Sequence, residues 1–210
     1  MNAGAPGAAG LRIVLASDNR GKLAEMRALL GASLPRIELL AQGALGIAPA
    51  PEPHETFLEN ALAKARHAAR ASGLPAVADD SGLCCAALGG APGVRSARLA
   101  GEPSSDAANN AALLALLRGQ ADRRAHYRCV IVALRAPSDP EPLVAEGLWH
   151  GLIVDAPAGE GGFGYDPHFL LPELGRTVAQ LEAGHKNVLS HRGIAMRAIV
   201  ARMGESWNIR

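Results

Sequence analysis

Two long apolar segments joined by a short polar turn constrain the fold of this chain more than any other feature. Residues 126–134 and 143–154 are long enough to form extended strands, and the polar segment PSDPEP lies between them. Proline, serine and aspartate are common turn residues, so the two segments are predicted to pair as an antiparallel hairpin. Such a hairpin excludes a purely parallel sheet.

The first half of the chain instead alternates extended and helical patterns. Residues 11–16 form an apolar run, and residues 22–30 then show helical spacing. A second strand is predicted at 37–40 and a helix at 56–71, which Thr56 caps. Alternation followed by a hairpin predicts the α/β class, with an elongated mixed β-sheet flanked by helices and two lobes around a central cleft.

The remaining segments complete this organisation. We expect an Ala- and Leu-rich helix at 106–117, a short strand near 168–170 and a C-terminal helix at 190–203. Residues 1–10 are predicted to be a disordered leader, and residues 11–210 to form a single domain. A chain of 210 residues is long enough to bury the core of one domain without disulfides or metal ions.

Charge and cysteine content narrow the classes of partner. Lys and Arg total 21 against 20 Asp and Glu, so the net charge of +1 favours neither polymeric nucleic acid nor an anionic membrane. Cys84 and Cys85 are adjacent and Cys129 is distant, which fits reduced, buried thiols better than a disulfide framework or a zinc site. Without a recognisable secretory signal or bilayer-spanning segment, we expect a cytoplasmic protein.

Adjacent carboxylates follow a short apolar run at Val77 and Ala78. We expect the strand to stop there, so that Asp79, Asp80 and Ser81 emerge at its end, a common place for active residues in α/β proteins. Two neighbouring acids repel each other, and an ion between them would relieve that repulsion. The alternative is a strand-to-turn junction in which Asp79 or Ser81 binds nearby backbone amides.

Three further segments carry groups that suit a ligand, each with a structural alternative. Residues 17–22, SDNRGK, offer free amides and a lysine to a phosphate, or form an ordinary helix cap. Glu52, Glu55 and Lys64 suit an ion and a phosphate, or form a solvated helix face. The glycine-rich loop 161–167 holds two of the few aromatic residues, which either stack on a planar ligand or fill the core.

A last polar cluster precedes the C-terminal helix. Lys186 and the segment 190–193, SHRG, gather donors that suit an anion or a carbonyl-rich base. The alternative is a helix cap beside a surface pair.

Taken together and in order, five blocks resemble the inosine triphosphate pyrophosphatase family, also called the dITP/XTP or nonstandard purine NTP pyrophosphatases. The blocks are LASDNRGKLAEM, ETFLENALAKARHAA, AVADDSGL with GGAPGVRSARLAG, GGFGYDPHF and KNVLSHRG, and they span nearly the whole chain. The resemblance implies hydrolysis of ITP, dITP and XTP to the monophosphate and pyrophosphate. It also implies Mg²⁺ as cofactor, a small-molecule nucleotide as substrate, and an elongated α/β fold that usually forms a homodimer.

The resemblance assigns roles to particular residues. Asp80 becomes the proton acceptor and a magnesium ligand, and Ser81 becomes a substrate contact. The second magnesium carboxylate falls on Glu52, with Glu55 as a possible substitute, because PEPHETF departs from the acidic pair and glycine usual in the family. The triphosphate contacts fall on Ser17, Asp18, Asn19, Arg20, Gly21, Lys22 and Lys64. The base contacts fall on Phe163, Gly164, Tyr165, Asp166, Lys186, His191 and Arg192.

Several points stay open at this level. The block containing Ser96, Ala97 and Arg98 matches the family, but no role can be assigned to these residues. A nucleotide sensor without turnover, or a phosphatase releasing inorganic phosphate, are the alternative functions. A dinucleotide-binding dehydrogenase is disfavoured, because SDNRGK replaces the glycine fingerprint after the first strand. The ranking of ITP, dITP and XTP is not predicted.

Overall fold

A computed structural model of the chain describes residues 11–33 and 37–207, so the leader expected at residues 1–10 lies outside the described residues. The strands are β1 (Leu11–Leu15), β2 (Ile37–Ala41), β3 (Ala76–Cys85), β4 (Arg124–Leu134), β5 (Leu143–Ile153), β6 (Phe169–Leu171) and β7 (Arg176–Thr177). The α-helices are α1 (Arg20–Ser33), α2 (Phe57–Ser72), α3 (Asp106–Leu116), α4 (Ala183–Leu189) and α5 (His191–Ser206). The main elements follow the predicted order.

The described strands form one seven-stranded sheet in the order β2-β1-β3-β4-β5-β6-β7. β1 runs parallel to β2 and β3, whereas each later pair of neighbours is antiparallel. β4 and β5 form the predicted hairpin, in which Arg124 lies opposite Leu152 and Ala133 opposite Leu143. The predicted mixed sheet is therefore confirmed.

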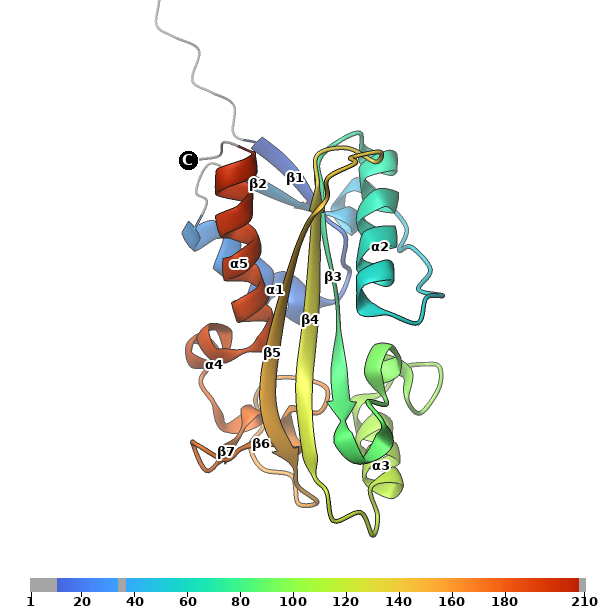
Figure 1. The fold of residues 1–210 in the computed structure, drawn as a ribbon, viewed down its shortest axis with the longest axis vertical. Coiled ribbons are helices and arrows are strands. Elements are labelled where there is room, and N and C mark those ends of the chain that lie inside the picture. Colours follow the sequence, from blue (N-terminus) through green and yellow to red (C-terminus); the bar gives the residue numbers. More distant parts are fainter. Residues whose placement is uncertain (1–10, 34–36, 208–210) are drawn as a thin grey trace, which may run out of the picture.

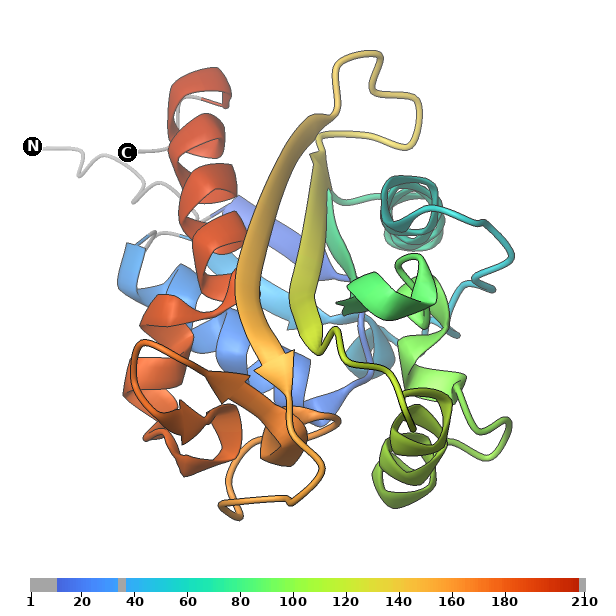
Figure 2. The ribbon, with the colours of Figure 1, turned by 60° about the horizontal axis from the view of Figure 1, so that its bottom comes forward.

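Helices cover both faces of the sheet (Figure 1 and Figure 2). α2 packs Ala61 and Ala65 against Val132 of β4. On the opposite face lie α1 and α5, where Met26 and Met196 share a second buried cluster. The small alanine side chains let α2 approach the sheet closely, which brings its polar residues near β3.

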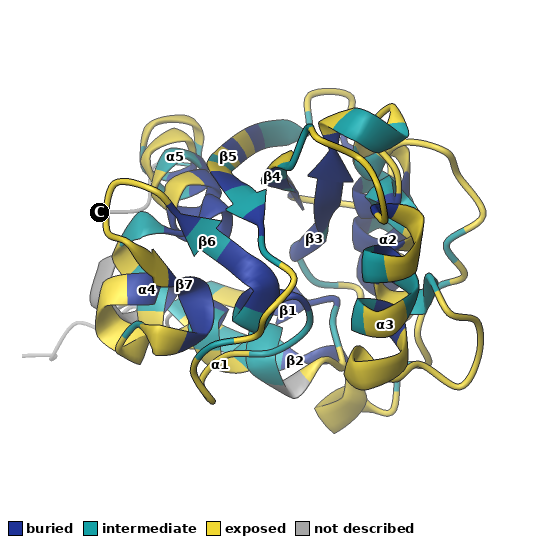
Figure 3. Ribbon diagram, turned by 90° about the horizontal axis from the view of Figure 1, so that it is seen from below, coloured by how far each residue is buried: buried dark blue, intermediate teal, exposed yellow. Residues whose placement is uncertain are grey.

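A third buried cluster fills the other end of the molecule, where α3 lies. Leu113 and Leu117 meet Leu83 of β3 and Phe169 of β6 there. Figure 3, seen from this end, shows buried β3 and β6 between the largely exposed outer surfaces of α3 and α4. The two lobes are joined by β3, β4 and β5, which run along the length of the molecule (Figure 1).

The sequence predicted that β3 would stop where the adjacent carboxylates begin, and this prediction was wrong. The strand continues for ten residues, from Ala76 to Cys85, because β4 pairs with it along its whole length. β1 in contrast pairs only with Ala76 and Val77. Beyond Val77, no strand within residues 11–33 and 37–207 pairs with that edge of β3, so the carboxylates lie in mid-strand beside the end of β1.

The three cysteines are free and buried, as expected. Burial raises the pKa of both Cys85 and Cys129 to about 12. No helix among residues 11–33 and 37–207 is long and apolar enough to cross a membrane.

Candidate active site

A cavity of about 320 Å³ opens beside the unpaired edge of β3. Segments from both lobes line it, including the end of β1, the loop before α2, the loop after β5 and the start of α5. The structure thus brings together most of the predicted site residues. Those lining the cavity are Ser17, Asp18, Asn19, Lys22, Glu52, Lys64, Asp80, Ser81, Phe163, Gly164, Tyr165, Asp166, Lys186, His191 and Arg192.

The phosphate-loop candidate forms where the chain leaves β1 and enters α1. Asn19 accepts a hydrogen bond from the backbone N–H of Lys22 at 3.0 Å, and Asp18 accepts one from Gln42 at 2.9 Å. Gly21 lies against Phe163, so closely that an added Cβ would come within 3.0 Å of the ring. The side chain of Arg20 lies outside the described part of the chain.

One wall of the cavity carries two carboxylates that face a single ammonium group. Lys64 Nζ donates to Glu52 Oε1 at 2.7 Å and to Asp80 Oδ1 at 3.2 Å. Asn60, one helical turn before Lys64 on α2, donates to Asp80 Oδ2 at 3.2 Å. Arg98 holds Glu52 from the outside, through the backbone oxygen at 3.1 Å and the carboxylate at 3.4 Å. The Arg98 side chain, which lacked a role at the sequence level, positions Glu52.

The environment shifts the pKa values of the two carboxylates in opposite directions. Burial raises the pKa of Asp80, with help from nearby Glu52 and Asp79, although Lys64 and Lys22 oppose the shift. Burial also raises the pKa of Glu52, but Lys64 outweighs it and the net pKa is lowered. Lys64 itself is buried, which lowers its pKa, yet the surrounding acids raise it overall. Asp80 is therefore a stronger base than an ordinary aspartate, whereas Glu52 is a weaker base than an ordinary glutamate.

Asp79 faces away from this cluster, which corrects the expectation of an ion between the adjacent acids. Its Oδ2 lies 3.1 Å from Lys22 Nζ and 3.5 Å from Arg192 Nε. Burial would raise the pKa of Asp79, but Lys22, Arg192 and Lys64 lower it well below its usual range. Successive residues of a strand point to opposite faces, so no single ion can lie between these two side chains.

The opposite wall of the cavity is built around Asp166 and Lys186. Lys186 Nζ lies 2.8 Å from Asp166 Oδ2 and 3.0 Å from Glu25 Oε1. It also lies 4.4 Å from the centre of the Phe163 ring, a cation–π distance. Tyr127 donates its hydroxyl to Asp166 at 3.1 Å. These contacts present the Phe163 ring beside a fixed positive charge, which suits an electron-rich planar ligand.

His191 and Arg192 begin α5 on the same side of the cavity. Arg192 pairs with Glu25 and donates to Ser81 Oγ at 3.1 Å. His191 stacks on Tyr127 with ring centres 4.8 Å apart. Burial and the neighbouring cations, Arg192 above all, lower the pKa of His191 well below 6.5. Its imidazole is therefore neutral at pH 7, and it carries a buried Nδ1 that makes no hydrogen bond with the described residues.

The two aromatic residues of the glycine-rich loop have different roles. Tyr165 is buried in the third cluster, beside α3, and donates its hydroxyl to the backbone oxygen of Ser96 at 2.7 Å. Ser96 in turn accepts from the backbone N–H of Leu83 at 2.8 Å. Phe163 is only half-buried and faces the cavity. Of the two, Phe163 is the ring suited to stacking, and Tyr165 anchors the loop.

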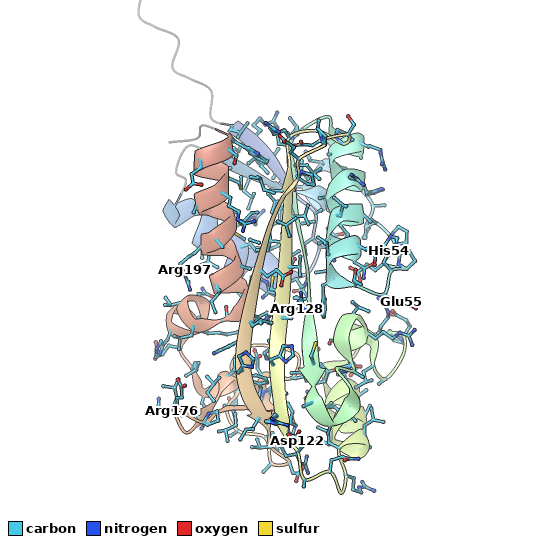
Figure 4. The ribbon with its side chains drawn as sticks, viewed as in Figure 1. His54, Glu55, Asp122, Arg128, Arg176 and Arg197 are labelled. Atoms are coloured by element: carbon cyan, nitrogen blue, oxygen red, sulfur yellow. The ribbon has the colours of Figure 1, made fainter. Side chains whose placement is uncertain are left out.

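Glu55 does not approach the cavity. It is exposed at the outer edge of the loop before α2 (Figure 4). Of the two candidate acids before α2, only Glu52 lies beside Asp80 and Lys64, and the structure therefore favours Glu52 as the second carboxylate.

Sequence reasoning missed several residues that hold this site together. Glu25 and Asn60 lie inside two of the family blocks but received no role, because helical Glu and Asn usually face solvent. Asn110, which donates to the backbone oxygen of Gly164 at 2.8 Å, lies outside all five blocks. Spacing was a further signal for the first two: Glu25 lies three residues after Lys22, and Asn60 four before Lys64, so each shares a helix face with a predicted site residue.

The carboxylate pair fits a magnesium ion by its chemistry. Mg²⁺ prefers oxygen ligands, and it is commonly held by one or two carboxylates while phosphates and waters complete its shell. Asp80 and Glu52 direct such oxygens toward the same place, because one oxygen of each lies within 3.2 Å of Lys64 Nζ. Among the residues described, no cluster of three or more His, Cys, Asp or Glu side chains suited to a metal occurs elsewhere or here. The protein would thus supply only part of the coordination.

Comparison with known proteins gives a consistent result. The Ham1 family model matches residues 13–202. The dITP/XTP pyrophosphatase of Burkholderia pseudomallei is 61% identical over 208 residues, covering 98% of this chain and 99% of the relative. That of Ralstonia nicotianae is 61% identical over 195 residues, covering 91% and 96% respectively.

Solved structures agree with the sequence comparison. The HAM1 protein from Coxiella burnetii is 45% identical to this chain and superposes with a TM-score of 0.87, covering 93% of this chain and 100% of its own. The Ham1 protein of Staphylococcus aureus, at 39% identity, has a TM-score of 0.82 and covers 92% and 98%. Together with the family match over most of its length, these similarities show that the chain belongs to the Ham1 family.

Proposed function

We propose that this protein hydrolyses the nonstandard purine nucleoside triphosphates ITP, dITP and XTP to the monophosphate and pyrophosphate. The observation that carries the proposal is one cavity with an acidic wall at Asp80 and Glu52 and a base-binding wall at Phe163 and Lys186. The relatives named dITP/XTP pyrophosphatase support the same reaction class.

Each wall has a distinct role in the proposed reaction. Lys22 and Lys64 bind the triphosphate oxygens and stabilise the pyrophosphate that leaves. Mg²⁺ held by Glu52 and Asp80 would neutralise phosphate charge and acidify a bound water. Asp80 accepts the proton of the water whose oxygen forms a bond to the α-phosphorus, while the bond to the bridging oxygen breaks. The raised pKa of Asp80 suits this role as a base.

Discrimination among purines is assigned to the start of α5. A keto oxygen at the six position can accept a hydrogen bond from Arg192 or His191, whereas adenine presents an amino group there. A buried donor left without an acceptor is costly, so adenine nucleotides bind less well. GTP shares the keto group, and we propose that its two-amino group finds no acceptor or no space. Equal turnover of GTP and ITP would contradict this part of the proposal.

Product identification tests the reaction against both alternatives. The protein is incubated with ITP and Mg²⁺, and pyrophosphate, inorganic phosphate and IMP are measured. Pyrophosphate and IMP support the proposal, inorganic phosphate supports a phosphatase, and nucleotide binding without product supports a sensor. Adding EDTA should abolish turnover, and excess Mg²⁺ should restore it.

We also propose that the protein is a cytoplasmic homodimer. The resemblance to the inosine triphosphate pyrophosphatases supports the dimer, and exposed apolar residues such as Leu148, Leu174 and Val188 are available for an interface. Sedimentation at two concentrations tests the dimer, because a monomer at both would contradict it. Cell fractionation tests the location.

A further inference from the structure

The first turn of α3 lies against the glycine-rich loop that carries Phe163. The carboxylate of Asp106 accepts a hydrogen bond from the backbone N–H of Gly164 at 2.6 Å. The side-chain amide of Asn110 donates to the backbone oxygen of Gly164 at 2.8 Å. Asp106 and Asn110 are four residues apart, so they share one face of the helix. Both backbone polar groups of Gly164 are therefore held by one helix that lies across the cavity from α4 and α5.

Gly164 is a point at which the loop needs such support. Its φ of +63° lies in the left-handed region, which glycine adopts readily and other residues rarely do. Gly161 and Gly162 precede it, so the backbone on this side is intrinsically free to vary. The N–H of Gly164 belongs to the peptide that follows Phe163, and its C=O belongs to the peptide that precedes Tyr165. Fixing both peptide planes fixes the direction in which the Phe163 ring points.

The other hydrogen bonds of the loop do not reach the N–H and C=O of Gly164, which α3 binds. Phe163 N–H donates to Asp166 at 3.0 Å, and Tyr165 is anchored through Ser96. The Asp166 N–H also donates to the Phe163 backbone oxygen at 3.4 Å. These bonds hold the residues on either side of Gly164, whereas the N–H and C=O of Gly164 itself are bound by α3. Asn110 also donates to the backbone oxygen of Asp106 at 2.9 Å, so its amide is oriented by its own helix before it reaches the loop.

We infer that Asp106 and Asn110 are positioning residues for purine recognition, acting through Gly164 to set the place of the Phe163 ring. This inference rests on the proposed function, in which Phe163 binds the base. Neither residue belongs to the acidic cluster at Asp80, so their loss should weaken substrate binding and selectivity while leaving the chemical step nearly intact.

The test compares Asp106→Ala and Asn110→Ala with a matched control on the same helix. Ser105→Ala removes the N-cap bond of α3 to Ala108 N–H but leaves both bonds to Gly164. For Asp106→Ala and for Asn110→Ala we expect KM for ITP to rise about tenfold, in line with loss of a hydrogen bond, and kcat to change less than about threefold. The preference for ITP over GTP in kcat/KM should fall about tenfold.

Conservative replacement separates positioning from a general loss of structure. Asp106→Asn keeps an oxygen that can accept from Gly164 N–H, so its KM should stay within about threefold of wild type. Ser105→Ala should leave KM and selectivity unchanged even where its melting temperature falls. If Asp106→Ala and Asn110→Ala keep wild-type KM and selectivity, or if Ser105→Ala reproduces their effects, the inference is overturned.

A readout independent of turnover distinguishes this inference from the proposed function. Hydrogen exchange of the Gly164 amide should accelerate about tenfold in Asp106→Ala and remain unchanged in Ser105→Ala. If the wild-type protein releases no pyrophosphate from any triphosphate, the proposed function fails, yet exchange at Gly164 still reports whether α3 holds the loop. Unchanged exchange in Asp106→Ala would overturn the inference whatever the substrate.

Discussion

The carboxylates of Asp79 and Asp80 point to opposite faces of β3. Asp80 meets Lys64 at 3.2 Å on the side of α2, whereas Asp79 meets Lys22 at 3.1 Å on the side of α1 and α5. Arg192 also faces Asp79, so that acid is neutralised by cations from two helices. One acid therefore ties the helices to the sheet, and the other faces the cavity with a raised pKa and is suited to catalysis.

Replacing the cavity-facing acid should remove the proposed base together with one of the two proposed Mg²⁺ carboxylates. We expect Asp80→Asn to lower kcat for ITP by about a hundredfold or more, the usual effect of losing a positioned general base. Pyrophosphate release is measured at saturating ITP and Mg²⁺, and circular dichroism checks the fold. Near wild-type turnover in a folded variant would remove Asp80 from the mechanism.

The neighbouring acid gives a matched comparison with a different outcome. Asp79→Asn leaves the fully buried Arg192 with only part of its counter-charge, because Glu25 remains. We expect the free energy of unfolding to fall by about 3 kcal/mol, as when one partner of a buried ion pair is removed. Urea unfolding measures it. A variant as stable as wild type would show that Asp79 does not anchor α5.

Arg98 should act on metal affinity through Glu52. Its guanidinium contacts both the backbone oxygen and the carboxylate of Glu52, so Arg98→Ala releases that acid from its position. We expect the Mg²⁺ concentration for half-maximal rate to rise about tenfold, as is typical when a residue that orients a metal ligand is lost. Direct Mn²⁺ binding, followed by electron paramagnetic resonance, should weaken in parallel. Arg95→Ala, an exposed residue of the same segment, is the control.

The neutral, buried His191 should make stability depend on pH. Burial first, and then Arg192 and Lys186, lower its pKa in the folded state well below 6.5, against a weaker opposing effect of Asp79. Below about pH 6.5 the unfolded chain binds a proton that the folded chain does not, so stability is lost as pH falls.

The size of this effect can be isolated by substitution. His191→Gln should reduce the slope of unfolding free energy against pH, between pH 6.5 and 5, by about 1.4 kcal/mol per unit. Urea unfolding at several pH values gives both slopes, and the other histidines contribute equally to each protein. Identical slopes would mean that His191 is protonated in the folded state.

A glycine of β5 sets how closely α5 approaches the sheet. A Cβ added at Gly147 would lie 2.0 Å from the backbone oxygen of His191, whereas one added at Gly184 in α4 would meet nothing within 4 Å. We expect Gly147→Ala to destabilise the protein by about 1–3 kcal/mol and Gly184→Ala to be neutral or slightly stabilising. Thermal unfolding measures the melting temperature of both variants. Equal melting temperatures for Gly147→Ala and Gly184→Ala would contradict the close approach of α5 to β5.

The sequence was informative where local chemistry decides the structure. The β4–β5 hairpin followed from two apolar runs around PSDPEP, and Thr56 caps α2 by accepting from Glu59 N–H at 3.2 Å. The family resemblance was confirmed, and it located residues that the fold does bring to one cavity.

Other features depend on contacts that no local pattern encodes. Asp79 and Asp80 looked like the end of a strand because charged residues rarely occupy a strand interior. They do so here because β4 pairs beyond them while cations from three helices neutralise them. The contacts of Glu25 with Lys186 and of Asp106 with Gly164 join segments far apart in the chain, which only the tertiary structure reveals.

The buried thiols have a practical consequence for labelling. A thiol with a pKa near 12 is almost entirely protonated at neutral pH, and the thiolate is the form that attacks alkylating reagents. Cys84, Cys85 and Cys129 are also shielded from bulky reagents. A single cysteine introduced at exposed Glu55 should therefore accept a maleimide fluorophore selectively, without prior removal of the native cysteines.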